Sequence, residues 1–221
     1  MIPEQLQTAI VIGATGLVGS QVVTALLGDE RIERVKIFVR RPSGRRHAKL
    51  EEFIIDFDAP RNWEHLVTGS VLFSALGTTL RKAGSKGAQF RIDYTYQYLF
   101  ARAAARNGVP SYVLVSSAGA SPDSRLFYSR MKGELDRDIQ KLSFQKISIL
   151  RPGLLTGQRE ETRLGEKIGA AVLNLLHRIP GLHRLKPIKG AIVAKAMIQA
   201  FFHQKDPICT YTLDEVFRRA E

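Results

Sequence analysis

Two serines, a tyrosine and a lysine are the residues of this sequence whose types and spacing best suit acid–base chemistry. Ser116 and Ser117 follow a short apolar run, and Tyr128 and Lys132 come soon after them. At a spacing of four residues, the tyrosine and the lysine share one face of a helix. A nearby ammonium favours phenolate and lowers the pKa of tyrosine from its usual value of about 10. The spacing therefore predicts an acid–base pair, whereas the serines could equally cap a turn.

A glycine-rich segment near the start of the chain predicts where a phosphate-bearing ligand binds. The apolar run 9–12 is typical of a buried parallel strand, and Gly13, Gly16 and Gly19 follow it. An apolar helical pattern comes next, and we expect Gly28 to end that helix in the left-handed conformation. This order is typical of a dinucleotide-binding loop, in which glycines let the backbone approach a pyrophosphate. A merely tight strand–helix turn is the alternative.

The second predicted strand, residues 34–39, ends in a basic segment that bears on which dinucleotide binds. Proteins that hold NAD usually place Asp or Glu about 20 residues past the glycines, where it binds the ribose 2′-hydroxyl. Arg40 occupies this position, and Arg41 follows it. A guanidinium attracts a 2′-phosphate that a carboxylate would repel, so the sequence favours NADP(H) over NAD(H). The alternative is that both arginines are ordinary solvated loop charges.

Two further strands are expected to end at the same edge of the sheet, where ligands of open α/β sheets bind. Strand 53–55 runs into Asp56, which either meets an adenine amino group or forms a turn. Strand 71–77 ends in Leu76 and Gly77, where the loss of side-chain bulk lets backbone lie along a cofactor.

The composition excludes several classes of protein. The chain has 221 residues, of which 44% are hydrophobic and 24% are charged, so it is neither a disordered nor a membrane composition. No secretory signal and no membrane-spanning helix are predicted. The single cysteine excludes an internal disulfide and is typical of a reducing compartment. We expect a cytoplasmic protein without a metal site.

The net charge of +12 comes from small scattered basic groups rather than from one basic arm. Such a charge is compatible with nucleic acid, an acidic membrane surface or an anionic small ligand. No helix-turn-helix, zinc-finger or RNA-recognition pattern accompanies it. We therefore expect no sequence-specific nucleic-acid binding.

The remaining elements are predicted from periodicity and from helix start and stop signals. Residues 84–87 are interpreted as a flexible loop, and Asp93 is expected to begin a helix. Later strands are predicted at 112–115, 147–150 and 208–212. The expected helices cover 17–27, 93–106, 124–142, 165–178, 192–202 and 214–220.

This alternation of strands and helices predicts an α/β fold with a doubly wound parallel sheet of about six to seven strands. We expect a single domain, 1–221, in which a small helical substrate-side region of about 154–221 is not independent. The amphipathic helix 165–178 is expected to pack on the core. A lid, a partner-binding face or a membrane-surface helix are the alternatives.

Together these motifs resemble the short-chain dehydrogenase/reductase superfamily, most of all its atypical branch around the HIV Tat-interactive protein, a small NADPH-binding relative. The motifs that carry the resemblance are GATGLVG at 13–19, Arg40-Arg41-Pro42, LGTT at 76–79, Ser116-Ser117, Tyr128-x-x-x-Lys132 and Arg151-Pro152-Gly153. They span nearly the whole chain. Asp93 stands where the superfamily often has an asparagine, and the short C-terminal region matches no substrate-defining motif.

The resemblance implies a role for each matching residue. Ser117 would hydrogen-bond a substrate carbonyl, Tyr128 would donate or accept the proton, and Lys132 would bind the nicotinamide ribose and lower the tyrosine pKa. Arg40 and Arg41 would hold the 2′-phosphate. The other cofactor-binding positions expected from the motifs and the resemblance are Gly13, Thr15, Gly16, Leu17, Val18, Gly19, Asp56, Leu76, Gly77, Ser116, Pro152 and Gly153.

These features predict an NADP(H)-dependent oxidoreductase. Hydride would pass between the nicotinamide and a carbonyl or alcohol carbon held against Ser117 and Tyr128. The expected partners are the dinucleotide and a small carbonyl compound, and the expected state is a monomer or homodimer. The alternative is a non-catalytic NADPH-binding regulator that acts through a protein partner, because the atypical branch includes regulators.

Overall fold

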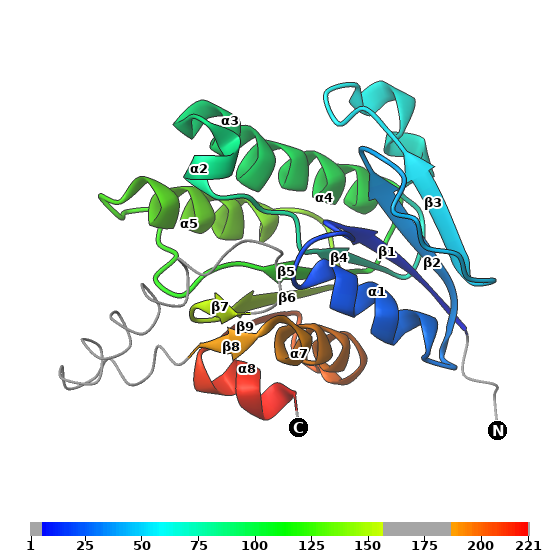
Figure 1. The fold of residues 1–221 in the computed structure, drawn as a ribbon. Helices are drawn as coiled ribbons and strands as arrows, with labels where there is room; N and C mark the ends of the chain where they lie inside the picture. Colours follow the sequence, from blue (N-terminus) through cyan, green and yellow to red (C-terminus); the bar gives the residue numbers. More distant parts are fainter. Residues whose placement is uncertain (1–5, 157–186, 221) are drawn as a thin grey trace.

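A seven-stranded parallel sheet forms the centre of the protein in the computed structural model, which describes residues 6–156 and 187–220 (Figure 1). The strand order is β3-β2-β1-β4-β5-β6-β9, and every neighbouring pair is parallel. The predicted doubly wound α/β fold is therefore confirmed. The strands are β1 (Gln7–Ile12), β2 (Ile32–Val39), β3 (Leu50–Ile54), β4 (Val71–Ser74), β5 (Ser111–Val115), β6 (Lys146–Arg151) and β9 (Ile208–Thr212).

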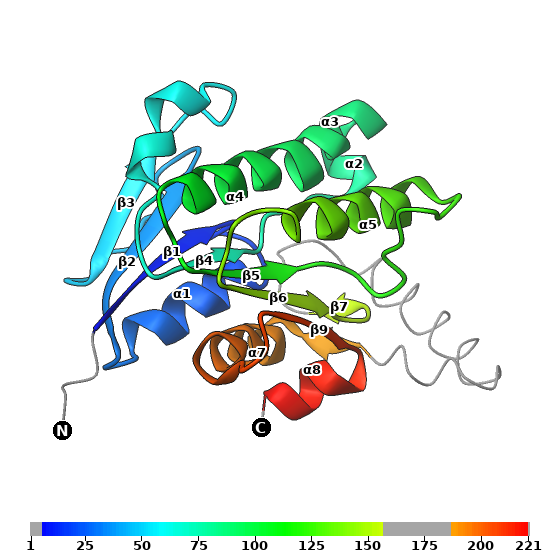
Figure 2. The same ribbon diagram turned by 180° about the vertical axis from the view of Figure 1, so that it is seen from behind.

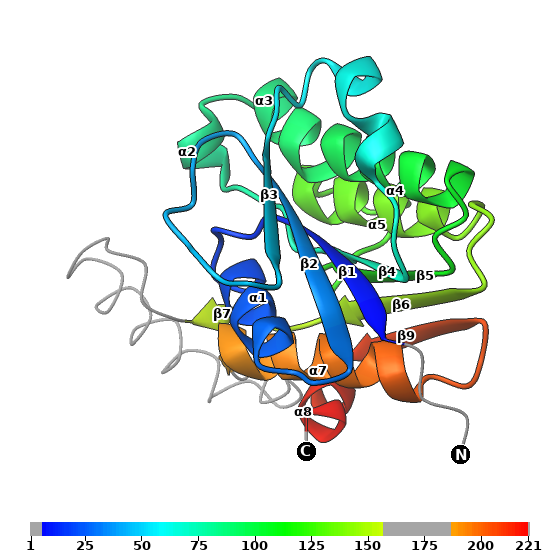
Figure 3. The same ribbon diagram turned by 90° about the vertical axis from the view of Figure 1, so that its right-hand side faces the viewer.

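Helices cover both faces of the sheet, as the two opposite views and the side view show (Figures 2 and 3). One face carries α1 (Gly19–Leu27) and α7 (Gly190–His203), and α8 (Asp214–Arg219) packs on α7. The other carries α4 (Tyr96–Arg106) and α5 (Phe127–Ile139). The short elements are η1 (Pro60–Asn62), η2 (Glu64–Leu66), α2 (Leu80–Ala83), α3 (Lys86–Phe90), η3 (Arg91–Thr95), β7 (Leu155–Thr156) and β8 (Ile188–Lys189), of which β7 and β8 pair with each other.

The two helix layers explain why the central strands are apolar without a break. Along β1, Ala9 and Val11 pack into the core on the α1 side, while Ile10 and Ile12 pack into the core on the α4 side. All four side chains are fully buried, and burying one aliphatic side chain stabilises the fold by about 1.5–3 kcal/mol. A strand covered on both faces therefore has no polar alternation.

Three predictions of local structure are wrong, and one helix cap, Ser85, explains two of them. Ser85 caps α3 by accepting a hydrogen bond from the amide of Ala88, so the segment expected to be a flexible loop at 84–87 includes the start of a helix. Asp93 consequently lies inside a continuous helical segment rather than at its start. Gly28 does end α1, but with φ −87° rather than in the left-handed region.

The C-terminal part of the sheet agrees with the sequence. The predicted last strand is β9, which adds to β6 in parallel, and the predicted helices before and after it are α7 and α8. The amphipathic segment 165–178 lies outside the described residues. Within the described part of the chain, no helix is both long enough and apolar enough to cross a lipid bilayer.

Candidate dinucleotide and active site

Strand register brings the predicted site residues to one edge of the sheet. Ile12 of β1 pairs with Phe38 of β2 and with Ser74 of β4, so the glycine loop lies between the ends of those strands. The strand order reverses between β1 and β4, which is where α/β sheets bind ligands. Farther along the same edge, Val115 of β5 pairs with Leu150 of β6. The serine pair and Pro152-Gly153 therefore follow neighbouring strands.

The glycine loop is a close-packed backbone turn. Gly13 has φ +78°, and a Cβ atom there would overlap the carbonyl of Ala75 in the loop after β4. A Cβ on Gly19 would overlap the Gly13 carbonyl. The Gly16 amide donates to the Gly13 carbonyl at 2.9 Å, which closes the turn. Both loops thus approach each other through backbone alone, as a pyrophosphate cradle requires.

The start of α1 is free to receive an anion. The helix has no acidic residue in its first turn and no side-chain cap. Thr15 is exposed and Leu17 is half-buried, whereas the Val18 side chain is 4% exposed and packs in the core. Val18 can therefore contact a ligand through its backbone only. Uncapped N–H groups and the helix dipole favour a phosphate at this position, so these residues fit a dinucleotide.

Arg40 and Arg41 are exposed at the carboxyl end of β2, beside the glycine loop. The loop that carries them is held at two points. The Ser43 amide donates to Glu52 of β3 at 3.0 Å. Arg45 donates to the hydroxyl of Thr24 in α1 at 3.0 Å. Both arginines are thus presented to solvent on a loop that is held at two points, and their contact with a ribose 2′-phosphate stays a prediction.

Asp56 makes the turn that was one of its two predicted roles. Its carboxylate accepts a hydrogen bond from the amide of Asp58 at 2.9 Å, and its carbonyl accepts one from the indole of Trp63 at 2.9 Å. The side chain is exposed at the end of β3. Its contact with adenine stays a prediction.

Lys132 is buried in an ion pair that the sequence did not predict. Its ammonium lies 3.7 Å from Asp93 Oδ1, and both side chains are under 5% exposed. Asp93 Oδ2 accepts the amide of Thr78 at 2.8 Å. Burial raises the pKa of Asp93, while the Lys132 charge and the Thr78 hydrogen bond act in the opposite direction. The carboxylate therefore joins α5 to the LGTT loop after β4.

A second contact fixes the helical segment that carries Asp93. The amide of Gln97 donates to the Asp93 carbonyl at 2.6 Å, and its oxygen accepts the Ser74 hydroxyl at 2.7 Å. Gln97 is fully buried, so these hydrogen bonds replace those it would make to water. The end of β4 is thereby linked to the segment that orients Lys132.

Tyr128 belongs to α5, the helix that also carries Lys132, and Ser117 follows β5. Tyr128 precedes Lys132 by one turn of α5 and is 41% exposed. The Ser117 hydroxyl donates to the Ala118 carbonyl at 3.3 Å, which is the local bond expected of a turn-capping serine. The amide of Ala118 donates to the Pro152 carbonyl at 2.9 Å, so the serine loop and the Pro152-Gly153 loop are joined.

A second buried ion pair lies one turn farther along α5. Asp136 Oδ2 accepts both Nε and a terminal nitrogen of Arg151, each at 2.9 Å. Burial raises the pKa of Asp136, and the Ser116 hydroxyl and the Arg151 charge oppose that rise. Ser116 is itself 5% exposed, so its side chain faces the interior rather than the edge of the sheet.

Sequence reasoning named Asp93 and Arg151 but missed the ion pairs that they form, and it missed Gln97 and Asp136 altogether. The spacing of Lys132 and Asp136 by four residues was a usable signal, because it places both on the Tyr128 face of α5. No local sequence pattern indicates that Lys132 pairs with Asp93 or that Asp136 pairs with Arg151. Among residues 6–156 and 187–220, no group of three or more His, Cys, Asp or Glu side chains could hold a metal ion.

Comparison with known families identifies what this arrangement belongs to. A family model described as NAD(P)H-binding matches residues 13–174. The chain belongs to this NAD(P)H-binding family. A solved short-chain dehydrogenase/reductase superfamily protein from Agrobacterium tumefaciens, with bound NAD, has the same fold with a TM-score of 0.68 at 19% identity, over 93% of this chain and 77% of that one. The predicted resemblance to the atypical short-chain dehydrogenase/reductases is thus confirmed as an NAD(P)H-binding family and as a shared fold. The branch around the Tat-interactive protein stays a prediction.

Several curated fungal proteins are similar to this chain over most of its length. FMP52 of Coccidioides immitis is 38% identical over 182 residues, which cover 76% of this chain and 74% of that protein. FMP52 of Candida albicans is 37% identical over 206 residues, covering 90% and 88%. Both are named mitochondrial. The predicted cytoplasmic location is therefore wrong.

Proposed function

We propose that this protein is an NADP(H)-dependent oxidoreductase of the short-chain dehydrogenase/reductase type. Hydride is exchanged between the dinucleotide and a small carbonyl or alcohol substrate. The observation that carries the proposal is the buried ion pair of Lys132 and Asp93. Lys132 lies one helical turn from Tyr128, and Asp93 binds the loop after β4, which packs on Gly13. A buried lysine one helical turn from a tyrosine, at the edge of the sheet where a dinucleotide would bind, is suited to catalysis. A purely structural role would not require a tyrosine beside it.

The residues present fit a bound NADP(H). The glycine turn would receive the pyrophosphate on backbone N–H groups, and Arg40 and Arg41 would pair with the 2′-phosphate. The loops with Leu76-Gly77 and Pro152-Gly153 would border the remainder of the ligand at the same edge of the sheet. Arginine is preferred for phosphate because its planar fork donates to two oxygens at once.

In the direction of reduction, bound NADPH supplies the hydride that reaches the carbonyl carbon. Ser117 turns its hydroxyl from the Ala118 carbonyl to the substrate oxygen and orients it. Tyr128 gives its phenolic proton to that oxygen, so that the product is the alcohol. Lys132 would donate to the ribose hydroxyls, and Asp93 keeps its ammonium in position.

We further propose that the protein works in mitochondria. The support is the similarity to FMP52 proteins of several fungi, all of which carry a mitochondrial name. Fractionation of cells that express the tagged chain, with markers for each compartment, measures this directly. Recovery with the cytosolic marker alone would contradict the proposal.

The test of the activity combines ligand retention with turnover. We expect mass spectrometry of the purified protein to show retained NADP(H), and a panel of carbonyl compounds to reveal NADPH oxidation. Tyr128→Phe should reduce turnover by at least about a hundredfold, in line with the usual contribution of a general acid. Tyr94→Phe, which removes a hydroxyl from a surface cluster, is the control and should leave turnover unchanged.

The alternative of a non-catalytic regulator gives different results. It predicts NADPH binding without turnover of any compound and a partner protein that is lost when NADPH is removed. Turnover that survives Tyr128→Phe would remove this tyrosine from its proposed role.

A further inference from the structure

The pair of Asp136 and Arg151 has a geometry that ordinary surface pairs lack. Asp136 is 1% exposed, and a single carboxylate oxygen receives two nitrogens of the guanidinium. Arg151 ends β6, and its carbonyl also accepts the amide of Leu213 at 3.3 Å, so the arginine backbone is held in the sheet. A buried charge is retained only when it is paired, and this pairing joins α5 to β6.

The position of the pair connects two parts of the proposed dinucleotide site. Asp136 follows Lys132 by one turn on the same face of α5. Arg151 directly precedes Pro152 and Gly153. Asp93, Asp136, Lys132 and Arg151 supply two carboxylates and two cations, so the buried charges balance. Because Asp136 shares α5 with Lys132 and Arg151 directly precedes Pro152, a shift of either Asp136 or Arg151 would move Lys132 relative to Pro152.

The surroundings of Asp136 keep its carboxylate in a polar interior. Among the described residues, three buried side-chain atoms have no hydrogen-bond partner: Tyr112 Oη, Ser116 Oγ and Asp136 Oδ1. The Ser116 hydroxyl opposes the rise that burial causes in the pKa of Asp136. Buried polar groups without hydrogen-bond partners cost stability. We expect such groups near α5 because the site on that helix must be held in place.

We propose that Asp136 is a positioning residue for the nicotinamide half of the dinucleotide site, acting through Arg151. The pair fixes the distance between Lys132 on α5 and the Pro152-Gly153 loop after β6. The inference rests on the proposed function. It assigns no contact between Asp136 and the ligand.

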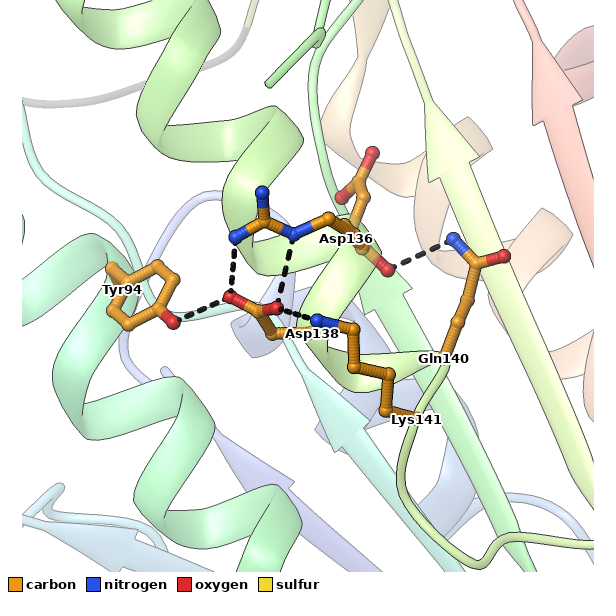
Figure 4. Close-up of polar contacts among 6 residues, drawn as sticks. Tyr94, Asp136, Asp138, Gln140 and Lys141 are labelled. Carbon is orange, nitrogen blue, oxygen red and sulfur yellow. Dashed lines mark hydrogen bonds and ion pairs between the residues drawn. The ribbon is translucent and has the colours of Figure 1, made fainter. Parts of the chain in front are cut away.

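A matched control lies two residues away on the same helix. Asp138 also accepts an arginine, Arg137, and a lysine, Lys141, but at the surface. Figure 4 shows the Asp138 carboxylate in this cluster with Tyr94, while the Asp136 carboxylate points away from it. Asp136→Asn and Asp138→Asn thus make the same chemical change on one helix, and only the first touches the link to β6.

The experiment compares two ligands by isothermal titration. NADPH probes the whole site, and adenosine 2′,5′-bisphosphate probes only the adenine half near Gly13 and Arg40. We expect Asp136→Asn to weaken NADPH binding by about tenfold, because a displaced Lys132 would lose a charge-assisted contact with the ligand, and to change bisphosphate binding by no more than about twofold. Arg151→Gln should do the same, and the double variant should be no weaker than either single one. Asp138→Asn should leave both ligands unchanged.

The remaining outcomes overturn the inference. If the variants weaken the binding of NADPH and of the bisphosphate equally, the loss is one of general structure. If NADPH binding is unchanged in both single variants, the pair does not position the site. If Asp136→Asn does not fold, Arg151→Gln decides, because the Arg151 side chain is 27% exposed and tolerates the change better. A wild-type protein that binds neither ligand overturns the proposed function itself, and the inference with it.

Discussion

Asp93 and Lys132 form a buried ion pair in which Asp93 Oδ1 lies 3.7 Å from Lys132 Nζ, and an exposed pair of the same length lies nearby. In the exposed pair, Arg91 NH1 is 3.7 Å from Asp58 Oδ1, and both side chains are more than half exposed. Distance alone therefore does not rank these contacts. Water screens the exposed pair, whereas loss of one buried partner leaves an uncompensated charge.

The contrast gives the first prediction. Asp93→Asn keeps an acceptor for the Thr78 amide but leaves Lys132 buried without a counter-charge. We expect the free energy of unfolding to fall by about 3–5 kcal/mol in urea denaturation at pH 7. Asp58→Asn should change it by less than about 0.5 kcal/mol. Equal effects of the two substitutions would show that the buried pair is not the stronger one.

The second prediction separates backbone strain from steric overlap. Gly13 and Gly44 have nearly the same positive φ, +78° and +74°, but only Gly13 has backbone where a Cβ would lie. Gly13→Ala should therefore destabilise the protein by about 1–3 kcal/mol more than Gly44→Ala, as measured by chemical denaturation. Equal losses would mean that the loop after β4 moves aside, and the cradle would not be rigid.

The third prediction concerns cofactor choice at the end of β2. Arg40→Ala and Arg41→Ala should each lower the affinity for NADPH by about tenfold to a hundredfold, because each would remove a charge-assisted contact with the 2′-phosphate. The affinity for NADH, which lacks this phosphate, should stay unchanged. Arg34→Ala, at the opposite end of the strand in an exposed pair with Glu51, is the control. A wild-type protein with equal affinity for NADPH and NADH would contradict this assignment.

The fourth prediction is a pH dependence of stability. Hydrogen bonds from Arg137, Lys141 and Tyr94 hold the pKa of Asp138 well below its ordinary 3.8. A group with a lowered folded-state pKa stabilises the protein above its unfolded-state pKa, and that contribution is lost as the pH falls below about 4. Asp138→Asn should thus cost about 1 kcal/mol at pH 7, and this cost should shrink progressively as the pH falls from about 4 toward 2.

This comparison cancels the opposing contributions of Asp93 and Asp136, whose raised pKa values favour the folded state at low pH in both proteins. Melting curves of the wild type and the variant across the pH range measure the difference. A gap that is constant with pH would exclude the ion cluster as its source.

The sheet and its binding edge could be predicted because they depend on local patterns. Apolar runs such as 9–12 mark strands covered on both faces, and the glycines after them mark a turn that only backbone can fill. The start of α3 was missed because a single cap, Ser85, outweighs the two glycines around it. The ion pairs were missed because Asp93 and Lys132 come from separate helices, and a sequence shows charge but not which charges meet.

The cellular location was predicted wrongly for a simpler reason. A single cysteine and the lack of a secretory pattern speak only against secretion, and more than one compartment satisfies that condition. The identity of the dinucleotide rests on Arg40 and Arg41.

The π-helical turn η3 has a consequence for how this site can change. Its wider winding, in which the amide of Tyr96 bonds the Arg91 carbonyl, accommodates one residue more than an α-helical turn would. Removing one residue between Asp93 and Gln97 would let this turn rewind as an α-helix, because the wide turn holds the extra residue. The helical segment can therefore lose one residue here without rotating the helix on either side.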